Sequence, residues 1–512
     1  MSQAETSQQA VMDFLGDPAG HGGAKVTRID THAASVFLAG ERALKVKRAV
    51  RFPFLDYSTL EKRKTACEAE IAVNRPFAPA IYRGVVPITR ESDGRLAIGG
   101  KGEAVEWAVD MRRFDETMTL DHLAERGEID ERLADSLARA VAKAHAVAPK
   151  AGGFAAELAE IIAQNDVELA ARPDLFAPAQ VAALGAATRA AYTRLRPLIE
   201  ARERAGCVAR CHGDLHLGNI VLLGGQPTLF DAIEFDPKIA TGDVFYDLAF
   251  LLMDLIERGL GAAANIVLNR YLAERRRLDD LDALAALPLF LSVRAAIRAK
   301  VTAARAALSV ERATPEQSAR DYFALAQELL APPPPQLLAV GGLSGTGKSL
   351  LARALAPETP PAPGAVVLRS DVERKALFGL RETERLPQAA YAREVTERVY
   401  AAIADKARRI VAAGHSAIAD AVFADPAERA AIARAAGDAA CHGLFLTADL
   451  SVRLARVGAR ARDASDADTV VAARQEQYDL GALDWATVDA SGTPADTLRR
   501  AQAVLTQRQA MR

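Results

Sequence analysis

The stretch GLSGTGKS at residues 342–349 decides the fold of the last third of this 512-residue chain. It follows the apolar run 337–340 and precedes the helical pattern 350–355, which is the order of strand, loop and helix that a phosphate-binding loop requires. Glycines let successive backbone N–H groups curl around phosphate oxygens, and the helix N-terminus adds positive potential. The sequence therefore predicts a triphosphate site here.

Two side chains of this loop have roles of their own. Lys348 is expected to reach the terminal phosphates of ATP, and Ser349 is expected to hold Mg²⁺. The residues predicted to bind the nucleotide are Gly342, Ser344, Gly345, Thr346, Gly347, Lys348 and Ser349. The alternative, a flexible glycine loop that binds nothing, explains neither the residue match nor its context.

Acidic residues follow the later strand-like segments of this region. Segments 365–368, 417–419 and 443–446 alternate with helical stretches, so we predict a parallel sheet whose ligand crevice opens at the carboxyl ends of the strands. Asp371 is placed to accept a proton from a substrate hydroxyl as a catalytic residue, although capping the next helix is an equal alternative. Asp420 is expected to be a metal-binding carboxylate.

Two arginines lie four residues apart further along. Arg456 and Arg460 fall on one helical face, and arginines on a closing segment can contact ATP and offset the charge of a phosphoryl group. A solvated basic helix face is the competing interpretation. With Asp371, Arg374 and Asp420, these residues make the last third resemble the small P-loop kinases of the gluconate-kinase and zeta-toxin-like branch. The resemblance implies an α/β P-loop kinase fold with a parallel sheet.

A second signature, HGDLHLGN, occupies residues 212–219. The spacing His-x-Asp-x-x-x-x-Asn is that of a kinase catalytic loop, in which the aspartate meets the substrate hydroxyl and the asparagine holds Mg²⁺. Asp214 is therefore the predicted catalytic residue, and Asn219 a predicted metal ligand. Asp231, which ends an apolar segment after a Gly-Gly turn, is the predicted second metal ligand.

Gly213, in place of the usual arginine, and His216 within the loop make this region resemble the aminoglycoside phosphotransferase and choline kinase branch of kinase-like folds. The resemblance implies an α+β bilobal protein-kinase-like fold of the aminoglycoside phosphotransferase type. It also implies that Asp247 braces the catalytic loop from a following helix.

The same resemblance requires a lysine on a strand and a glutamate on a helix. Lys45 and Lys47 point to the same side of a strand, so both stay open for the ATP phosphates, and Lys45 is favoured because it follows two apolar residues. Glu70 is the expected partner of that lysine, and Glu68 competes for the role. The usual glycine-rich loop is absent, and residues 31–35 stand in its place.

Four consecutive prolines at 332–335 mark the clearest boundary, because they stiffen the chain into an extended spacer. We predict a kinase-like domain over 1–331, with a small lobe at about 20–114 and a helical lobe at about 115–331, a linker at 332–336 and a P-loop domain over 337–512. Expected elements of the first domain are strands at 34–38, 43–47, 81–88 and 106–114, and helices at 58–74, from 120 onward and at 131–147.

The composition indicates an ordinary globular protein. The net charge of −2 arises from 64 basic and 66 acidic residues, so nothing draws the whole chain to nucleic acid or to an anionic membrane. The four cysteines are too scattered for a disulfide framework, and Cys207, Cys211 and His212 lack the partner ligands of a zinc site. We expect a cytoplasmic enzyme whose oligomeric state the sequence does not give.

Together the two signatures resemble a bacterial fusion family described as bifunctional aminoglycoside phosphotransferase and ATP-binding protein. This resemblance implies an ATP- and Mg²⁺-dependent kinase that phosphorylates hydroxyl groups of small molecules at two sites. Two alternatives stay open. One domain is a weak sensor that regulates the other, or the P-loop domain is an ATPase without a small-molecule acceptor.

Overall fold

The computed structural model describes residues 3–52, 55–308, 312–459, 465–466 and 469–510. The chain forms two compact units, one made of residues 1–164 and 196–254 and the other of residues 165–195 and 255–512. The linker expected at 332–336 lies inside the second unit, so the domain boundary placed there stays a prediction.

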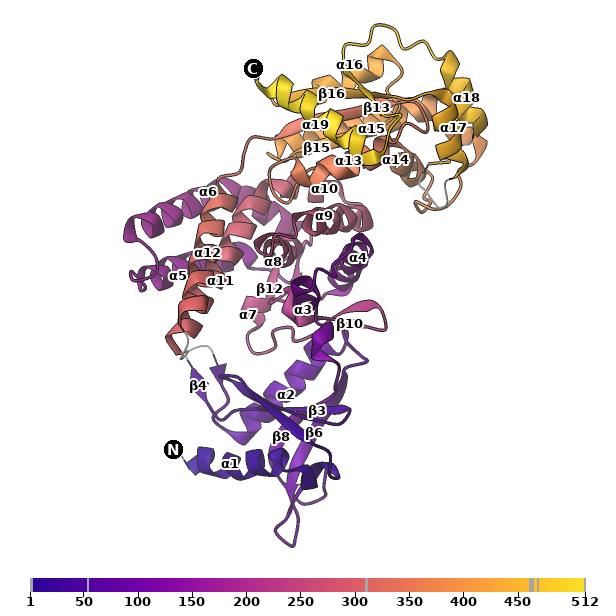
Figure 1. Cartoon of the computed structure of the whole chain (residues 1–512). Helices are drawn as coiled ribbons and strands as arrows, with labels where there is room; N and C mark the ends of the chain where they lie inside the picture. The colour runs from indigo at the N-terminus through magenta and orange to yellow at the C-terminus, as the bar shows by residue number, and fades with distance from the viewer. Residues whose placement is uncertain (1–2, 53–54, 309–311, 460–464, 467–468, 511–512) are drawn as a thin grey trace. The chain divides into compact units, whose positions relative to one another are not determined.

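The first unit begins with an antiparallel sheet of six strands in the order β1-β2-β3-β8-β6-β7. Its strands are β1 (Val26–Asp30), β2 (Ala34–Ala39), β3 (Arg42–Lys47), β6 (Tyr82–Arg90), β7 (Leu96–Ile98) and β8 (Glu103–Arg112). Helices α1 (Gln3–Gly16) and α2 (Leu60–Asn74) cover opposite faces of this sheet (Figure 1). A short hairpin, β4 (Arg51–Phe52) and β5 (Leu55–Asp56), precedes α2.

The side chains of β3 alternate between the two faces of the sheet. Leu44 and Val46 are fully buried against apolar residues of α1, including Leu15. Successive strand side chains point to opposite faces, so Lys45 and Lys47 lie on the face that α2 covers. One strand thus supplies part of a hydrophobic core and two cations on its other side.

The strands expected at 34–38, 43–47, 81–88 and 106–114 correspond to β2, β3, β6 and β8, with ends shifted by a few residues. Helix α1 and strand β1 were not expected. Helix α1 is fixed by Gln8, whose Nε2 donates to the Lys47 carbonyl and to Glu106 Oε2, both at 2.8 Å. These partners are distant in sequence, so no local pattern announces the helix. Strand β1 pairs with β2.

Between residues 120 and 330 the chain is mostly helical. The helices are α3 (Leu120–Glu125), α4 (Glu131–Val147), α5 (Phe154–Ala170), α6 (Pro178–Arg204), α7 (Pro237–Ala240), α8 (Val244–Glu257), α9 (Gly261–Arg275), α10 (Leu278–Asp282), α11 (Leu287–Leu308) and α12 (Ala313–Leu330). Two strand pairs hold the central loops, β9 (Val208–Arg210) with β12 (Thr241–Asp243) and β10 (Ile220–Leu223) with β11 (Gln226–Leu229).

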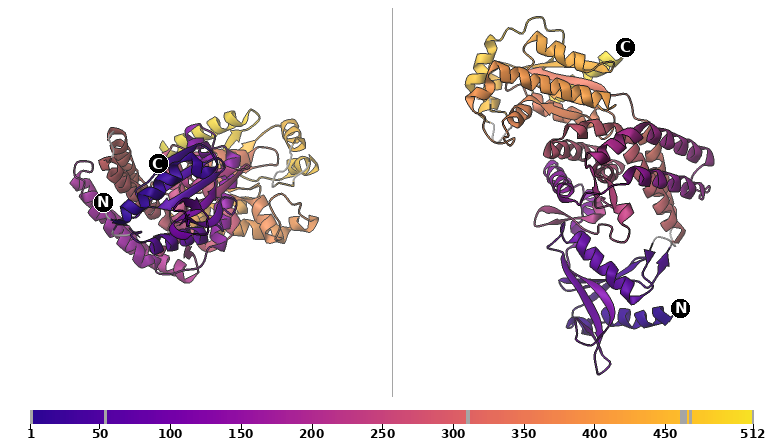
Figure 2. Two further views of the ribbon diagram at one scale, coloured as in Figure 1. Left: turned by 90° about the horizontal axis from the view of Figure 1, so that it is seen from below. Right: turned by 180° about the vertical axis from the view of Figure 1, so that it is seen from behind.

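The second unit contains a parallel sheet of five strands in the order β14-β15-β13-β16-β17, which confirms the predicted parallel sheet. Its strands are β13 (Gln336–Gly342), β14 (Val366–Arg369), β15 (Ala417–Asp420), β16 (Ala440–Thr447) and β17 (Ala486–Asp489). Its helices are α13 (Lys348–Leu355), α14 (Ser370–Leu377), α15 (Arg393–Ala412), α16 (Pro426–Ala435), α17 (Leu450–Gly458), α18 (Thr469–Arg474) and α19 (Pro494–Ala510). Helices cover both faces of the sheet (Figure 2).

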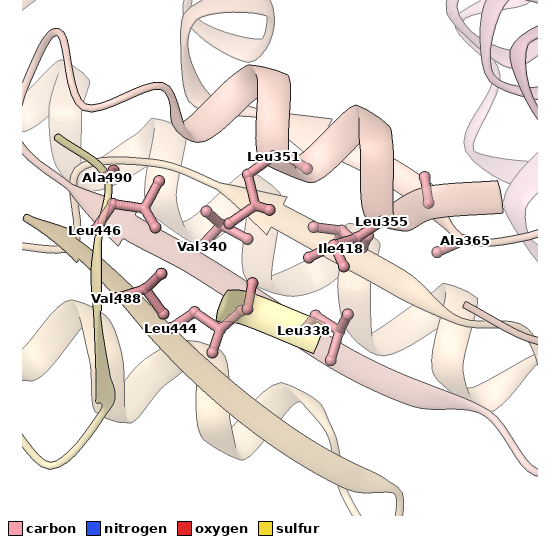
Figure 3. Close-up of a cluster of buried hydrophobic side chains, with 13 residues drawn as sticks. Leu338, Val340, Leu351, Leu355, Ala365, Ile418, Leu444, Leu446, Val488 and Ala490 are labelled. Carbon is pink, nitrogen blue, oxygen red and sulfur yellow. The ribbon is translucent and has the colours of Figure 1, made fainter. Parts of the chain in front are cut away.

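Aliphatic side chains from the middle strands fill the core under α13. Leu338, Val340, Leu444 and Leu446 pack against Leu351 and its neighbours on α13 (Figure 3). Parallel strands that are covered on both faces read as nearly continuous apolar runs, as β13 and β16 do. This packing fixes the strand whose end carries the glycine loop. Among the described residues, no helix combines the length and apolarity that crossing a bilayer would require.

Helix α9 covers the exposed side of the edge strand β14 within the second unit. Asn269 Oδ1 accepts a hydrogen bond from Val367 N at 2.8 Å, and its Nδ2 donates to the Ala365 carbonyl at 3.1 Å. Asn265 Nδ2 donates to the same carbonyl at 3.0 Å. The two amides therefore replace the missing neighbour strand, which would otherwise leave backbone groups of an edge unpaired.

These contacts predict a graded loss of stability. Asn269→Ala leaves the Val367 N–H without its partner, and an unsatisfied buried group costs about 1–3 kcal/mol. Asn265→Ala should cost less, because Asn269 still donates to the Ala365 carbonyl. Urea unfolding of the full-length variants measures both free energies, and equal losses for the two variants would contradict this assignment.

Candidate functional sites

In the first unit, Lys45 lies between two carboxylates. Its Nζ is 2.9 Å from Glu70 Oε1 and 2.6 Å from Asp231 Oδ1. Glu68 takes no part, because its side chain is 57% exposed and lies 4.0 Å from Lys64 on the helix surface. The structure therefore brings together the strand lysine, the helix glutamate and the aspartate that the sequence singled out.

Lys47 has different surroundings from Lys45. Its Nζ contacts Glu70 Oε2 at 2.5 Å and also pairs with Glu234, which accepts a hydrogen bond from Tyr57 as well. The Lys47 side chain is 3% exposed. Lys47 thus lies in the interior beside Glu70, whereas Lys45 contacts Asp231, whose side chain is 44% exposed.

This network keeps both lysines charged. Burial lowers the pKa of the Lys45 ammonium, but the carboxylates of Asp231 and Glu70 outweigh burial and hold that pKa well above its ordinary value. Burial raises the pKa of Glu70, and the two lysines overcome this effect and lower it. The site therefore presents a fixed cation beside a half-exposed carboxylate.

The loop 212–219 is held by backbone and side-chain hydrogen bonds. Asn219 Nδ2 donates to Asp214 Oδ2 and to the Asp214 carbonyl, both at 3.0 Å. The Asn219 carbonyl accepts from Phe230 N at 3.0 Å, which places Asp231 next to the loop. Gly213 has a φ of 83°, and a Cβ there would lie 3.1 Å from Ala240 Cα. These two constraints explain glycine at position 213.

Asp247 braces this loop from α8. Its Oδ1 accepts from Gly213 N at 2.8 Å, and its Oδ2 accepts from His212 N at 3.3 Å. His145 Nε2 lies 3.1 Å from the same Oδ2. Ligand atoms of His145, Cys211 and Asp247 lie within 4.8 Å of one another, yet the carboxylate already serves the loop. The arrangement is that of a structural brace.

The donor set of this site fits a hard cation. Asn219 uses its nitrogen toward Asp214, which leaves its amide oxygen available, and Asp231 offers a carboxylate. Carboxylate and amide oxygens are the ligands that Mg²⁺ takes in phosphate-binding sites. Asp231 also has a φ of 59°, a strained backbone conformation that recurs at functional positions.

A tight turn forms at the position where the sequence lacks the usual glycine-rich loop. Residues 31–33 join β1 to β2, and the turn closes through Thr31, whose backbone N–H donates to the Ala34 carbonyl at 2.8 Å. Thr31 Oγ1 accepts from Ala34 N at 3.0 Å. The turn therefore has its own hydrogen bonds and presents few free backbone N–H groups to a phosphate.

In the second unit, the loop 343–347 joins β13 to α13 in a conformation that needs its glycines. Gly342 and Gly345 have φ values of 136° and 88°, and a Cβ at either position would lie 2.6 Å from a carbonyl oxygen, of Leu446 and Arg453 respectively. Gly347 has a φ of 92° with open space beside it. The loop therefore forms a cradle at the N-terminus of α13, as binding of a phosphate requires.

Lys348 and Thr346 fold back onto this loop. Lys348 Nζ donates to the Leu343 carbonyl at 3.1 Å, and Thr346 Oγ1 donates to the same carbonyl at 2.8 Å. Ser344 N donates to Gln475 Oε1 at 2.6 Å. The lysine is thereby positioned at the mouth of the cradle.

Asp420 and Ser349 lie on neighbouring elements at the carboxyl edge of the sheet. Asp420 pairs in register with Val340 of β13 and with Arg369 of β14. Arg369 Nε lies 3.4 Å from Asp420 Oδ2, and its Nη2 lies 3.1 Å from Ser349 Oγ. One guanidinium thus joins the two expected metal ligands, a contact that the sequence did not suggest.

Asp371, the second residue of α14, lies beside these groups. Burial raises the pKa of the Asp371 carboxyl, the Asp420 carboxylate raises it further, and Lys348 and Arg369 oppose both effects. Arg374, one turn later, donates through Nη1 to the Ala390 carbonyl at 2.7 Å. Arg374 therefore holds the segment before α15 in place.

Arg456 and Arg460 were the two arginines expected to contact ATP from a closing segment. Arg456 donates to the carbonyls of Ala490 at 2.8 Å and of Gly492 at 2.6 Å, and it lines the cavity over the loop. Arg460 lies outside the described residues. A third arginine of this region, Arg453, was missed. It is 2% exposed and its Nε donates to the Ser344 carbonyl at 2.9 Å, so it supports the glycine loop from below.

The loop and the acidic groups share one cavity of about 1050 Å³. Its walls include Lys348, Ser349, Asp371, Asp420 and Glu428. The loop cradle, the lysine and the hydroxyl and carboxylate oxygens are the kinds of donors and ligands that a magnesium nucleotide requires.

Two different family models match separate parts of the chain. Residues 111–285 match the family model of the Phosphotransferase enzyme family, and residues 337–479 match that of the AAA domain. The Uncharacterized proteins Rv2004c of Mycobacterium tuberculosis and Mb2027c of Mycobacterium bovis are each 31% identical over 470 residues, which is 88% of this chain and 90% of theirs. The chain belongs to the family of these mycobacterial proteins.

Within this family assignment, the N-terminal part has a phosphotransferase kinase-like fold and the C-terminal part a P-loop kinase fold, so the predicted fold classes are confirmed. Solved structures with local likeness include a gluconokinase from Sinorhizobium meliloti 1021, with 20% identity and a TM-score of 0.26 over 34% of this chain and 93% of that one. A choline/ethanolamine kinase family protein from Mesorhizobium loti has 16% identity and a TM-score of 0.36 over 63% and 95%.

The acid Glu428 in the cavity wall leads to a prediction about pH. Burial raises the pKa of the Glu428 carboxyl to about 7. A carboxyl whose pKa is higher in the folded state stabilises the fold at pH values below its unfolded pKa, and this contribution is lost as pH rises through the folded value. Glu428→Gln mimics the protonated acid, so its melting temperature should match the wild type near pH 4.5 and exceed it near pH 8.

Glu394, exposed in the first turn of α15, provides the control. Glu394→Gln should give a difference in melting temperature that does not vary between these pH values. A Glu428→Gln difference that is equally constant with pH would show that this carboxyl ionises normally in the folded protein.

Proposed function

We propose that the chain is an ATP-dependent phosphotransferase with two sites, each of which transfers the γ-phosphoryl group to a hydroxyl of a small molecule. One observation carries the proposal. Two different folds each gather a lysine and an aspartate suited to a metal, namely Lys45 with Asp231 in one unit and Lys348 with Asp420 in the other. The family models support phosphoryl transfer in general, and the acceptors are part of the proposal.

At the first site, Lys45 would bind nucleotide phosphates while Glu70 keeps the lysine in place. Asn219 and Asp231 would hold Mg²⁺, which when bound offsets the charge of the phosphates. Asp214 would accept the proton of the acceptor hydroxyl, and its orientation is set by Asn219. Asp247 keeps the loop fixed during this transfer, which satisfies the requirement that a proton acceptor be positioned before the reaction.

At the second site, the loop N–H groups and Lys348 would bind the phosphates, and Ser349 with Asp420 would hold Mg²⁺. Asp371 would take the proton of the acceptor hydroxyl as its oxygen bonds to the γ-phosphorus and the bond to the bridging oxygen of ADP breaks. Arg456 lies over the loop, where it would contact the nucleotide. The partners we propose are hydroxylated small molecules, with no nucleic acid or membrane, in a cytoplasmic location.

A regulatory role for the first site is a second candidate. The self-bonded turn at residues 31–33 offers few N–H groups to cover phosphates, which disfavours fast transfer and is compatible with binding of a nucleotide or metabolite as a signal. In that case, the first unit would sense a ligand and the P-loop site would perform the chemistry.

Two variants separate these functions. The full-length wild type, Asp214→Asn and Lys348→Ala are each incubated with MgATP and a panel of hydroxylated metabolites, and the phosphorylated products are identified by mass. In Asp214→Asn, loss of a positioned base lowers the rate by about 10²–10⁴-fold, and Lys348→Ala removes the cation proposed to bind the phosphates of the second site. Each variant should therefore lose the product of one site and keep the product of the other.

The alternatives give different results. If Lys348→Ala abolishes every product and Asp214→Asn abolishes none, the first site is a sensor. ATP consumption at a high rate without any acceptor would indicate an ATPase instead. Exposed Arg408 on α15 provides the control, since Arg408→Ala should leave both products unchanged.

A further inference from the structure

Arg369, the last residue of β14, contacts the two side chains that would hold a metal ion in the P-loop site. Its Nη2 donates to Ser349 Oγ at 3.1 Å and its Nε donates to Asp420 Oδ2 at 3.4 Å. The Arg369 side chain is 13% exposed, and that of Asp420 is 5% exposed. A single partly buried guanidinium therefore bridges the two side chains that are expected to hold Mg²⁺.

The register of the sheet fixes this placement. Arg369 of β14 and Asp420 of β15 are paired residues of parallel strands, and both strands end at these positions. Asp420 is also paired with Val340 of β13, the strand that leads into the glycine loop and Ser349. The contact follows from the strand ends and not from a long, freely moving loop.

A Mg²⁺ ion that used Ser349 Oγ and Asp420 Oδ2 would compete with Arg369 for the same two oxygens. Mg²⁺ takes oxygens at about 2.1 Å in an octahedron, whereas Arg369 already fills the space beside the same hydroxyl and carboxylate oxygens. Arginine also stays charged at every working pH, so it cannot leave by losing a proton. Binding of the metal through these two oxygens would therefore displace the Arg369 contacts to Ser349 and Asp420.

We propose that Arg369 is a built-in counter-ion of the P-loop metal site, which holds Ser349 and Asp420 in the metal-free protein and is displaced when the metal binds with nucleotide. The proposal rests on the function proposed for this site. Without nucleotide, the free energy of metal binding is reduced by the loss of the Arg369 contacts, so the metal binds weakly. Nucleotide phosphates add further ligands, and the metal then enters together with its nucleotide.

The test measures metal binding by the full-length protein without any reaction. Free Mn²⁺ is followed by electron paramagnetic resonance in 0.3 M KCl, with and without the ATP analogue AMP-PNP. All samples carry Asp231→Ala, which removes a metal ligand of the first site. In this background, Arg369→Met keeps most of the stem of the side chain and removes the charge. We expect it to bind Mn²⁺ without nucleotide about tenfold more tightly than the parent protein.

A matched control distinguishes displacement from general electrostatics. Arg353 Nε donates a hydrogen bond to the backbone carbonyl of Ser349 at 3.2 Å, and not to the side-chain hydroxyl that would bind the metal. Arg353→Met removes a nearby charge that salt screens, so its Mn²⁺ affinity should change by less than about twofold. Arg369→Lys, which keeps the charge but not the bidentate fork, should give an intermediate affinity.

Each remaining outcome is decisive. Equal or weaker Mn²⁺ binding by Arg369→Met would overturn the proposal, because Arg369 would then position Asp420 for the metal. No Mn²⁺ binding by this variant with or without AMP-PNP would overturn it too. A third result would separate the two proposals. If Arg369→Met binds Mn²⁺ more tightly but neither the parent protein nor Lys348→Ala binds AMP-PNP, the proposed nucleotide function is refuted and the counter-ion role of Arg369 is supported. A circular dichroism spectrum verifies that each variant is folded.

Discussion

Parallel pairing of β13 with β15 is the constraint on which the P-loop site depends. Because Val340 and Asp420 are register partners, the glycine loop that follows one strand opens beside the carboxylate that ends the other. The apolar core under α13 holds this register, and a slip by one residue would reverse the faces of all its side chains. The chemistry of the second unit is therefore set by packing that lies below the loop.

In the first unit, a buried charge positions the residues of the site. Glu70 has no exposed side-chain surface and contacts both Lys45 and Lys47. A buried carboxylate with a missing partner is strongly unfavourable, so each lysine is tied to the glutamate and through it to α2. The alternation of β3 makes this possible, since the same strand anchors the sheet to the α1 core through Leu44 and Val46.

The sequence predicted best what is contiguous along the chain. The predicted phosphate loop and the loop at 212–219 each carry the residues of their predicted chemistry within eight positions, so a local pattern suffices to single them out. Arg369 escaped prediction because its meaning comes from strand register, and no local pattern shows which strands are neighbours. Sequence alone also could not separate Lys45 from Lys47, because both lie on one face. Only the position of Asp231, distant in the chain, makes them different.

Helix α1 and strand β17 illustrate the same limit on the scale of the fold. α1 is placed by Gln8, which bonds to two residues far along the chain, and β17 is a strand of four residues at the sheet edge. Propensity alone gives little signal for such elements, because tertiary contacts decide them.

The central claim is that one polypeptide binds a magnesium nucleotide at two independent places. Isothermal titration of the full-length protein with AMP-PNP and Mg²⁺ measures this directly. The account predicts two equivalents bound by the wild type, and one equivalent bound by Lys45→Ala and by Lys348→Ala alike. A wild-type stoichiometry of one that either substitution leaves unchanged, or no binding at all, would contradict it.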